Sequence, residues 1–446
     1  MNTFCFGFAK EDITPNYGIP LCGYFNPRPN RGAYDRLAVK AAVFRSGEND
    51  LAAVVSYDLC YITAAFSNDV EEILRKNASP LAGKVIYCTT HTHTGPYTSE
   101  LFSSNCIDED YMQILKEKTV AALNNAFSAL APAEMYTTTT ECTTLAFNRR
   151  FVMKNGKVLT NPGKLNPDID HPEGGVDHSI LLMEIRQNDL PVLLMANISN
   201  HTDTIGGDIV SADWPGRMES CIQNELGFDL PVMTIIAPQG NINHFDVSTP
   251  VNQTGYEEAK RIGRAYAAAI LAARYKLAKQ ENTAVKTNSL TFEAPYIQLT
   301  DEEYSNAKAV YEKYKDEVME SGRDFTSEDI AKGTPFVMKF FAERAIECRD
   351  NPITGKRIES QMVLTFGDAI AFVSMPCEAF VEIGFAIRKA SKYPMTFLVA
   401  LGMGEIGYVG LPENYGIGGY ETSPSRGLAD RTVGETIIKN AVSLLK

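Results

Sequence analysis

Short apolar runs suited to β-strands alternate with longer runs of helical periodicity along most of this 446-residue chain. The strand-like runs lie at 4–15, 37–44, 51–59, 84–87, 134–140, 179–185, 192–199, 232–244, 361–380 and 394–402, and the helix-like runs at 67–77, 108–130, 257–278 and from 433 onward. Such alternation is typical of sheets packed against helices. We therefore predict an α/β fold, with layered sheets and flanking helices. No internal repeat and no linker-like stretch is visible, so we expect one domain over residues 1–446.

Two stretches depart from this alternation. Residues 148–175 are rich in Asn, Pro, Gly and Asp, which predicts a loop region. Residues 299–346 are highly charged, and their apolar residues recur at helical spacing. We expect the second stretch to form peripheral helices laid on the main domain.

The stretch CTTHTHTGP, at 88–96, follows the apolar run KVIY and ends in a Gly-Pro turn signal. His91 and His93 therefore lie at the end of a strand. In an extended chain, residues i and i+2 point to the same side, so the two imidazoles can converge on one point. Paired imidazoles at this spacing suit a divalent metal, although two histidines in a polar surface loop fit the same pattern.

A third histidine, His201, ends the apolar run VLLMANISNH, and the chain has only 6 histidines in all. Catalytic zinc usually binds three or four nitrogen, oxygen or sulfur ligands and leaves one position open to water. Two loops at strand ends are able to supply such a set, so we predict a metal site at the strand-end loops.

Composition excludes several classes of protein. The 9 cysteines are scattered without a CxxC pair, which indicates reduced thiols and no cysteine-type zinc site. The net charge of −13 argues against nucleic acid and anionic lipid surfaces as partners. No apolar run approaches the roughly 20 residues of a membrane helix. The first residues do not read as a secretory signal, so we expect a cytoplasmic protein, although a trimmed signal would leave the same sequence.

Taken in order, the segments FGFAKEDITP, THTHTGP, NHTDT, QGNIN, MPCE and YVGLPENYGIGGYE resemble the neutral, or non-lysosomal, ceramidases, a family of zinc amidohydrolases. The resemblance covers nearly the whole chain, and the order and spacing of the segments are more specific than any one of them. It implies an α/β catalytic domain. We expect the catalytic domain only, without the C-terminal immunoglobulin-like domain of the longer members.

The resemblance implies one zinc ion bound by His91, His201, Glu378 and Tyr408. A phenol with a pKa near 10 is rarely a ligand, but an adjacent dication favours the phenolate. A second family tyrosine corresponds to Tyr420.

The resemblance also implies catalytic roles for His93, Arg149 and Tyr420, with Arg149 favoured over its neighbour Arg150. Zinc lowers the pKa of a bound water to about 7 and so provides a nucleophile at neutral pH. Arg149 and Tyr420 are candidates to stabilise the developing oxyanion, and His93 to protonate the departing amine. Which group accepts the proton of the water is left open.

The other histidines, His171, His178 and His244, are expected to be structural or loop residues. Asn241 and Asn243 either shape the pocket floor or form a Gly/Asn turn.

We therefore predict a zinc-dependent amidohydrolase that cleaves the N-acyl bond of a small-molecule substrate. The missing accessory domain and signal, and the net charge of −13, fit poorly with a membrane lipid. The alternative is a zinc esterase, lactonase or deacetylase acting on a soluble sugar or peptide derivative. A purely structural zinc clamp is a third reading, but an oxygen-rich, water-accessible ligand set disfavours it. The oligomeric state is left open.

Overall fold

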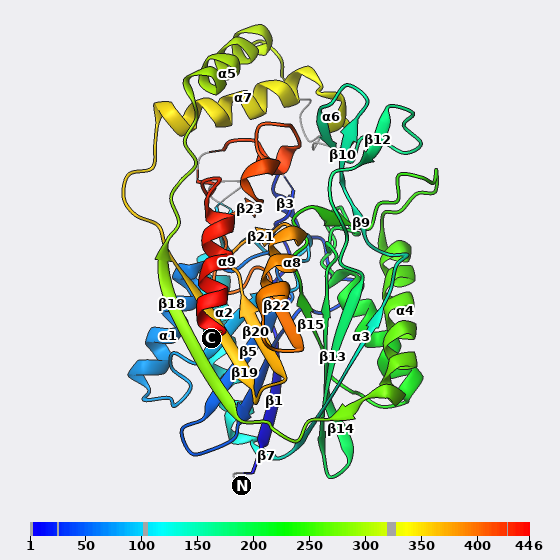
Figure 1. The fold of residues 1–446 in the computed structure, drawn as a ribbon, viewed down its shortest axis with the longest axis vertical. Helices are drawn as coiled ribbons and strands as arrows, with labels where there is room; N and C mark the ends of the chain where they lie inside the picture. Colours follow the sequence, from blue (N-terminus) through cyan, green and yellow to red (C-terminus); the bar gives the residue numbers. More distant parts are fainter. Residues whose placement is uncertain (1–2, 25, 101–105, 319–326, 426) are drawn as a thin grey trace.

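A computed structural model describes residues 3–24, 26–100, 106–318, 327–425 and 427–446. Within these ranges, three units repeat one order of elements (Figure 1). Each unit has three antiparallel strands, a helix, a fourth strand parallel to the third, and a second helix. The four main strands of a unit form one sheet.

The first unit contains β1 (Cys5–Asp12), β4 (Ala38–Arg45), β5 (Leu51–Tyr57), α1 (Ala64–Lys76), β6 (Val85–Thr89) and α2 (Glu109–Ser128). The second contains β8 (Glu134–Glu141), β13 (Ser179–Gln187), β14 (Leu190–Ile198), α3 (Asp213–Leu226), β15 (Val232–Ile236) and α4 (Tyr256–Ala273). The third contains β18 (Val285–Glu293), β19 (Ile358–Phe366), β20 (Ile370–Ser374), α8 (Val381–Ala390), β22 (Met395–Val399) and α9 (Val433–Leu444). In the first two units a short strand, β7 (Ala131–Pro132) or β17 (Ala278–Lys279), follows the second helix and extends the sheet.

The predicted α/β fold is confirmed, and the structure adds a threefold repeat that is not visible in the sequence. The repeat lies in the order and pairing of the elements and not in the residues. The fourth strands read VIYCT, VMTII and MTFLV in the three units. Buried strands accept many combinations of apolar residues of suitable volume, so a repeated backbone leaves no repeated motif.

The three sheets turn their inner faces toward one shared core. Side chains from all three meet there, including Phe44, Met183 and Phe372. The outer face of each sheet is covered by the two helices of its own unit. Strands placed between the core and the helices are buried on both faces, which explains why they read as continuous apolar runs.

The segment expected to be helical and peripheral carries α5 (Asp301–Tyr314), α6 (Ser327–Lys332) and α7 (Pro335–Asp350), and residues 319–326 lie outside the described ranges. These helices form a cap at one end of the molecule, at the top of Figure 1. A capping box begins α5, in which the Thr300 hydroxyl accepts from the Glu303 amide and the Glu303 carboxylate accepts from the Thr300 amide. Arg431 also pairs with Glu303, at 2.5 Å, and so joins the cap to the main body.

The prediction of a loop at 148–175 is wrong in part. The stretch includes a small sheet formed by β10 (Arg150–Met153), β11 (Val158–Thr160) and β12 (Ile169–Pro172). These strands are too short for alternation to be recognised among turn residues. Further short strands pair loop with loop: β2 (Pro20–Leu21) with β3 (Arg28–Pro29), β9 (Phe147–Asn148) with β16 (Ile242–Asn243), and β21 (Glu378–Ala379) with β23 (Tyr408–Val409).

The parallel third and fourth strands of each unit end at the same edge of their sheet. Backbone hydrogen bonds join the units at these ends. The Ala400 amide donates to the Ile236 carbonyl at 2.9 Å, and the Met403 amide donates to the Tyr87 carbonyl at 2.8 Å. The loops of all three units therefore meet at one place. Among the described helices, none is both long enough and apolar enough to cross a membrane.

Candidate metal centre

The loop that leaves β6 carries His91 and His93 into the interior. His91 lies two residues beyond the end of β6 and has a φ of 64°, in the left-handed region that residues other than glycine seldom adopt. His91 is completely buried, and His93 is 8% exposed. The structure thus places both predicted histidines at a strand end, as the sequence indicates.

His91, His201 and Glu378 meet at one point. His91 Nε2 lies 3.1 Å from His201 Nε2 and 3.1 Å from Glu378 Oε2. His201 Nε2 lies 3.7 Å from Glu378 Oε2. All three side chains are fully buried. His201 follows β14 and Glu378 follows β20, so each of the three units contributes one residue.

Backbone carbonyls fix the orientation of the two imidazoles. His91 Nδ1 lies 2.9 Å from the Cys60 carbonyl oxygen, and His201 Nδ1 lies 3.4 Å from the Gln239 carbonyl oxygen. A carbonyl only accepts, so each Nδ1 carries the hydrogen and each Nε2 presents a lone pair. Burial, together with the positive charge of Arg149, holds the pKa of His201 well below its ordinary value. Two lone pairs and a carboxylate oxygen therefore face one another.

A divalent cation fits this arrangement. Acceptor atoms at 3.1 Å repel one another unless a cation lies between them. Both oxygens of Glu378 are buried without a hydrogen-bond partner among the residues described. Ligand atoms bound tetrahedrally at about 2.0–2.2 Å from zinc lie about 3.3–3.6 Å apart, close to the separations of the three atoms here.

Tyr408 lies next to Glu378, because β21 and β23 pair in parallel with these two residues in register. The Tyr408 hydroxyl is 3.3 Å from the Tyr420 hydroxyl, and the two rings are perpendicular. Burial and the negative charge of Glu378 raise the pKa of Tyr408 well above its ordinary value. A cation at Glu378 would act in the opposite direction and favour the phenolate.

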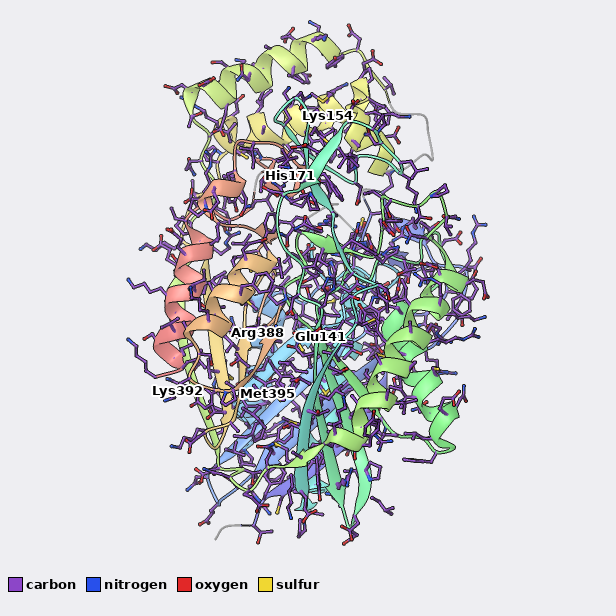
Figure 2. All side chains as sticks on the ribbon, turned by 45° about the vertical axis from the view of Figure 1, so that its right-hand side comes forward. Glu141, Lys154, His171, Arg388, Lys392 and Met395 are labelled. Atoms are coloured by element: carbon purple, nitrogen blue, oxygen red, sulfur yellow. The ribbon has the colours of Figure 1, made fainter. Side chains whose placement is uncertain are left out.

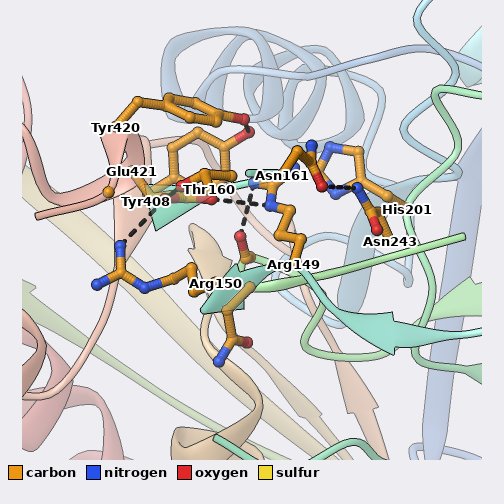
Figure 3. A network of polar contacts seen from close by, with 12 residues as sticks. Arg149, Arg150, Thr160, Asn161, His201, Asn243, Tyr408, Tyr420 and Glu421 are labelled. Carbon is orange, nitrogen blue, oxygen red and sulfur yellow. Dashed lines mark hydrogen bonds and ion pairs between the residues drawn. The ribbon is translucent and has the colours of Figure 1, made fainter. Parts of the chain in front are cut away.

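Arg149 lies beside both tyrosines (Figure 3). Its guanidinium carbon is 5.2 Å from the ring centre of Tyr408 and 5.3 Å from that of Tyr420. Arg149 Nε forms an ion pair with Glu421 at 2.9 Å, and Nη2 donates to the Gly240 carbonyl at 2.7 Å. These two contacts hold the guanidinium in a fixed position.

The neighbouring Arg150 has different contacts. It forms ion pairs with Glu173 and with Glu421, the latter at 3.1 Å. Its Nη2 donates to the carbonyls of Asn414 and Gly418, at 3.2 and 3.1 Å. Arg150 thus fastens the last Gly-rich loop to the small sheet, whereas Arg149 lies beside the tyrosines.

His93 lies at the edge of the centre. Its Nε2 is 3.3 Å from His91 Nε2, and its backbone amide donates to the Thr202 carbonyl at 3.3 Å. Burial, strengthened by the neighbouring His91, lowers the pKa of His93 to about 3. The His93 imidazole is therefore neutral at pH 7 when no metal is bound.

The sequence analysis missed a pair formed by half-buried Asp203 and fully buried His244. His244 Nε2 lies 2.7 Å from the Gln253 carbonyl oxygen, and Nδ1 lies 3.3 Å from Asp203 Oδ1. The Gln253 carbonyl only accepts, so Nε2 carries a hydrogen, and Nδ1 lies within ion-pair distance of Asp203. Burial alone would lower the pKa of His244, but Asp203 raises it above the ordinary value. The acidic residue two positions after His201 was the one sequence signal for this pair.

The remaining candidates make other contacts. His171 is on β12 and, with Lys154, occupies the outer part of the small sheet near the cap (Figure 2). Asn241 fastens loops, since its side chain donates to Glu382 and accepts from the Val381 amide, each at 2.9 Å. Asn243 similarly donates to the Asn161 side chain at 2.9 Å.

The fold and the site together define an α/β protein of three similar units with a candidate metal centre where their loops meet. Sequence comparison finds no match among protein families or curated proteins. Solved structures that share the fold include the following two. A ceramidase complexed with C2 matches with a TM-score of 0.73 and 15% identity, over 100% of this chain and 75% of that one. The neutral ceramidase from Pseudomonas aeruginosa matches with a TM-score of 0.72 and 16% identity, over 100% and 74%. The chain therefore has a ceramidase-like fold.

Proposed function

We propose that this protein is a zinc-dependent amidohydrolase that cleaves an N-acyl amide bond. The observation that carries the proposal is the cluster of buried acceptor atoms, His91 Nε2, His201 Nε2 and Glu378 Oε2, which face one another at 3.1–3.7 Å. Two histidines and one glutamate form a known catalytic zinc set, whereas closed structural zinc sites prefer cysteine and histidine.

In this proposal Tyr408 is the fourth ligand, because it lies in register with Glu378 on the paired strand. When bound, zinc acts as a Lewis acid and provides an activated water nucleophile near neutral pH. The protein contributes the orientation of the two imidazoles, through the carbonyls of Cys60 and Gln239.

Arg149 and Tyr420 are proposed to bind the acyl oxygen as it becomes negative. Arg149 is held by Glu421 and by the Gly240 carbonyl, so it need not reorganise during the reaction. Burial raises the pKa of Tyr420 above its ordinary value, although Arg149 opposes the shift. Tyr420 therefore keeps its hydrogen at pH 7 and is a donor.

His93 is proposed to move the proton. The attacking water adds to the acyl carbon, the C–N bond breaks, and the nitrogen takes up a proton, so the products are a carboxylic acid and an amine. An amide requires this proton because its anion is a very poor leaving group. The imidazole of His93 lies beside His91, so its position supports this role.

We propose a small-molecule N-acyl amide as the substrate. Both structural neighbours are ceramidases, so a long-chain acyl amide is the first compound to test. The net charge of −13 argues against nucleic acid. A single catalytic domain over residues 1–446 and a cytoplasmic location remain predictions.

The test uses the zinc-loaded protein with chromogenic N-acyl amides of short and long chain, beside matched esters. We expect the amides to be hydrolysed, the activity to disappear with a chelator, and zinc to restore it. Hydrolysis of the esters alone would contradict the proposed amidase, and activity that survives complete zinc removal would contradict the proposed cofactor.

A further inference from the structure

Arg28 is the first residue of β3, and its guanidinium donates to backbone carbonyls of three separate segments. Nη2 donates to the His93 carbonyl at 2.7 Å and to the Cys22 carbonyl at 2.5 Å, and Nη1 donates to the Gly207 carbonyl. These carbonyls belong to the β2–β3 hairpin, the loop after β6 and the loop after β14. Arg28 thus binds the backbone of the residue proposed to move the proton.

The hairpin is also shaped to lie against His93. Gly23 has a φ of 100°, and a Cβ there would lie 2.5 Å from His93 Cβ, so only glycine allows this close approach. The ring of Tyr24 lies at 87° to that of His93, with the ring centres 5.8 Å apart. The guanidinium carbon of Arg28 is 4.2 Å from the centre of the Tyr24 ring. Three residues of one hairpin therefore surround the same histidine.

Other contacts attach the hairpin to the main body. An antiparallel bridge joins β2 to the segment that follows the two histidines. The Arg31 amide donates to the Asp208 carbonyl at 2.8 Å, and the two side chains form an exposed ion pair at 3.0 Å. The hairpin is thus fastened to both neighbouring loops by contacts that do not involve Arg28. What Arg28 adds is a hydrogen bond that fixes the backbone of His93.

We propose that Arg28 is a positioning residue, which holds His93 where its imidazole is able to protonate the departing amine. This inference rests on the proposed function. A guanidinium suits the task because its planar fork donates in several fixed directions at once, whereas a lysine ammonium lacks this geometry. Moving a catalytic group by about 1 Å is able to cost about 100-fold in rate. Loss of the fork should therefore slow proton transfer and leave the zinc in place.

The test compares Arg28→Lys and Arg28→Gln with Arg31→Gln, each in the zinc-loaded protein. Arg31 is the matched control, because it lies on the same segment and its ion pair joins the hairpin to the same loop. We would measure zinc content, Tm, hydrogen exchange, and kcat and KM for an alkyl N-acyl amide and the matched nitrophenyl ester. The ester serves as an internal control, since a nitrophenolate leaves without a proton and an amine does not.

We expect both Arg28 variants to keep their zinc. For the amide, kcat should fall about 10- to 100-fold with little change in KM, and the ester rate should change much less. The peptide that contains His93 should exchange its amide hydrogens faster, since its hydrogen bond to the Thr202 carbonyl is held less firmly. Arg31→Gln should match the wild type in every quantity.

A double-mutant cycle tests whether Arg28 acts through His93. His93→Ala removes the imidazole, so adding Arg28→Lys to it should slow amide hydrolysis little further. An equal loss with and without the imidazole would mean that Arg28 acts independently of His93, and would overturn the inference.

Loss of zinc together with equal falls in the amide and ester rates would show a structural role and would also overturn it. So would an unchanged amide rate, or unchanged exchange around His93, in both Arg28 variants. A wild-type protein that hydrolyses neither compound would instead contradict the proposed function, and with it the role of Arg28 in proton transfer.

Discussion

In the first and third units the chain leaves the fourth strand with the same backbone conformation, but the side chain at that point has a different role in each unit. Two residues beyond β6 lies His91, with a φ of 64°, and two residues beyond β22 lies Leu401, with a φ of 50°. In both, the residue contacts the loop after the third strand of its own unit, since His91 Nδ1 faces the Cys60 carbonyl and the Leu401 amide donates to the Cys377 carbonyl at 3.0 Å. The unusual backbone therefore belongs to the repeated fold.

The side chains at these equivalent positions differ. His91 joins the candidate metal centre, whereas Leu401 packs with Cys60, Tyr61 and Tyr97 in a small buried cluster. Strained backbone is often taken as a sign of function. Here the same conformation occurs with and without a functional side chain, so the strain alone does not identify the site.

The second unit differs from both. Two residues beyond β15 lies Pro238, whose ring fixes φ near −65° and excludes the left-handed conformation. The chain therefore leaves β15 through another turn, and Gln239 follows. The second unit contributes its candidate ligand, His201, from the loop after its third strand, as the third unit does with Glu378 after β20.

Alanine at the two equivalent positions should have opposite consequences, and this is the largest effect we expect. His91→Ala removes a proposed ligand, so zinc content and activity should both fall to background. Leu401→Ala should keep its zinc while the free energy of unfolding falls by about 2–5 kcal/mol, as for other buried leucines. Elemental analysis, kcat and urea unfolding measure the three quantities. Loss of zinc in Leu401→Ala would break the comparison.

The two tyrosines of the third unit, Tyr408 and Tyr420, lie further along the chain than Leu401. Removing the hydroxyl of each in turn should separate their roles. Tyr408→Phe should weaken zinc retention, because it removes the proposed fourth ligand. Tyr420→Phe should keep zinc and lose about 10²–10³ in kcat, the usual effect of one preorganised donor. Zinc content and kcat of the two purified variants check this. A fully active Tyr420→Phe enzyme would remove Tyr420 from the mechanism.

The sequence was most informative where a functional side chain directly follows a strand. His91, His93 and His201 could be placed because each stands within a few residues of a buried apolar run. Glu378 and Tyr408 were found only through the family resemblance, since a glutamate after a strand is not unusual. The α/β class followed from the alternation of strands and helices.

Other features could not be predicted because they exist only in three dimensions. The threefold repeat is a property of pairing order, and unrelated apolar residues form its strands. The contacts of Arg28 join three segments that are separate in the sequence, so no local pattern predicts them. The pairing of Asp203 with His244 joins loops 41 positions apart by their numbering, 244 − 203.

The units also differ in how they bury charge, which predicts a pH effect. Lys40 of the first unit pairs with Glu219 of the second at 2.6 Å. In the third unit, burial raises the pKa of Glu359 from 4.5 to about 7, and Arg357 only partly opposes the shift. Between pH 4.5 and about 7, the Glu359 carboxyl is protonated in the folded protein but ionised in the unfolded chain. The free energy of unfolding therefore falls as pH rises through this range.

Glu359→Gln cannot lose that proton. Its Tm should therefore exceed the wild-type Tm at pH 8 by more than it does at pH 5. Thermal unfolding of both proteins across this range gives the difference directly. A difference that is constant with pH would show that Glu359 titrates normally.

The smallest effect concerns the backbone itself, measured on metal-free protein. Asparagine tolerates the left-handed conformation better than alanine, by at most about 1–2 kcal/mol. At position 91 the side chain lies among polar groups, including the Cys60 carbonyl and Glu378, so His91→Asn should be more stable than His91→Ala by about 1 kcal/mol. At position 401 the surroundings are largely apolar, and burying an amide there costs about 1–3 kcal/mol, so Leu401→Asn should be the less stable of its pair. Urea unfolding of the four variants gives the two differences. The same sign at both positions would mean that backbone strain, and not the side-chain environment, sets the stability of these turns.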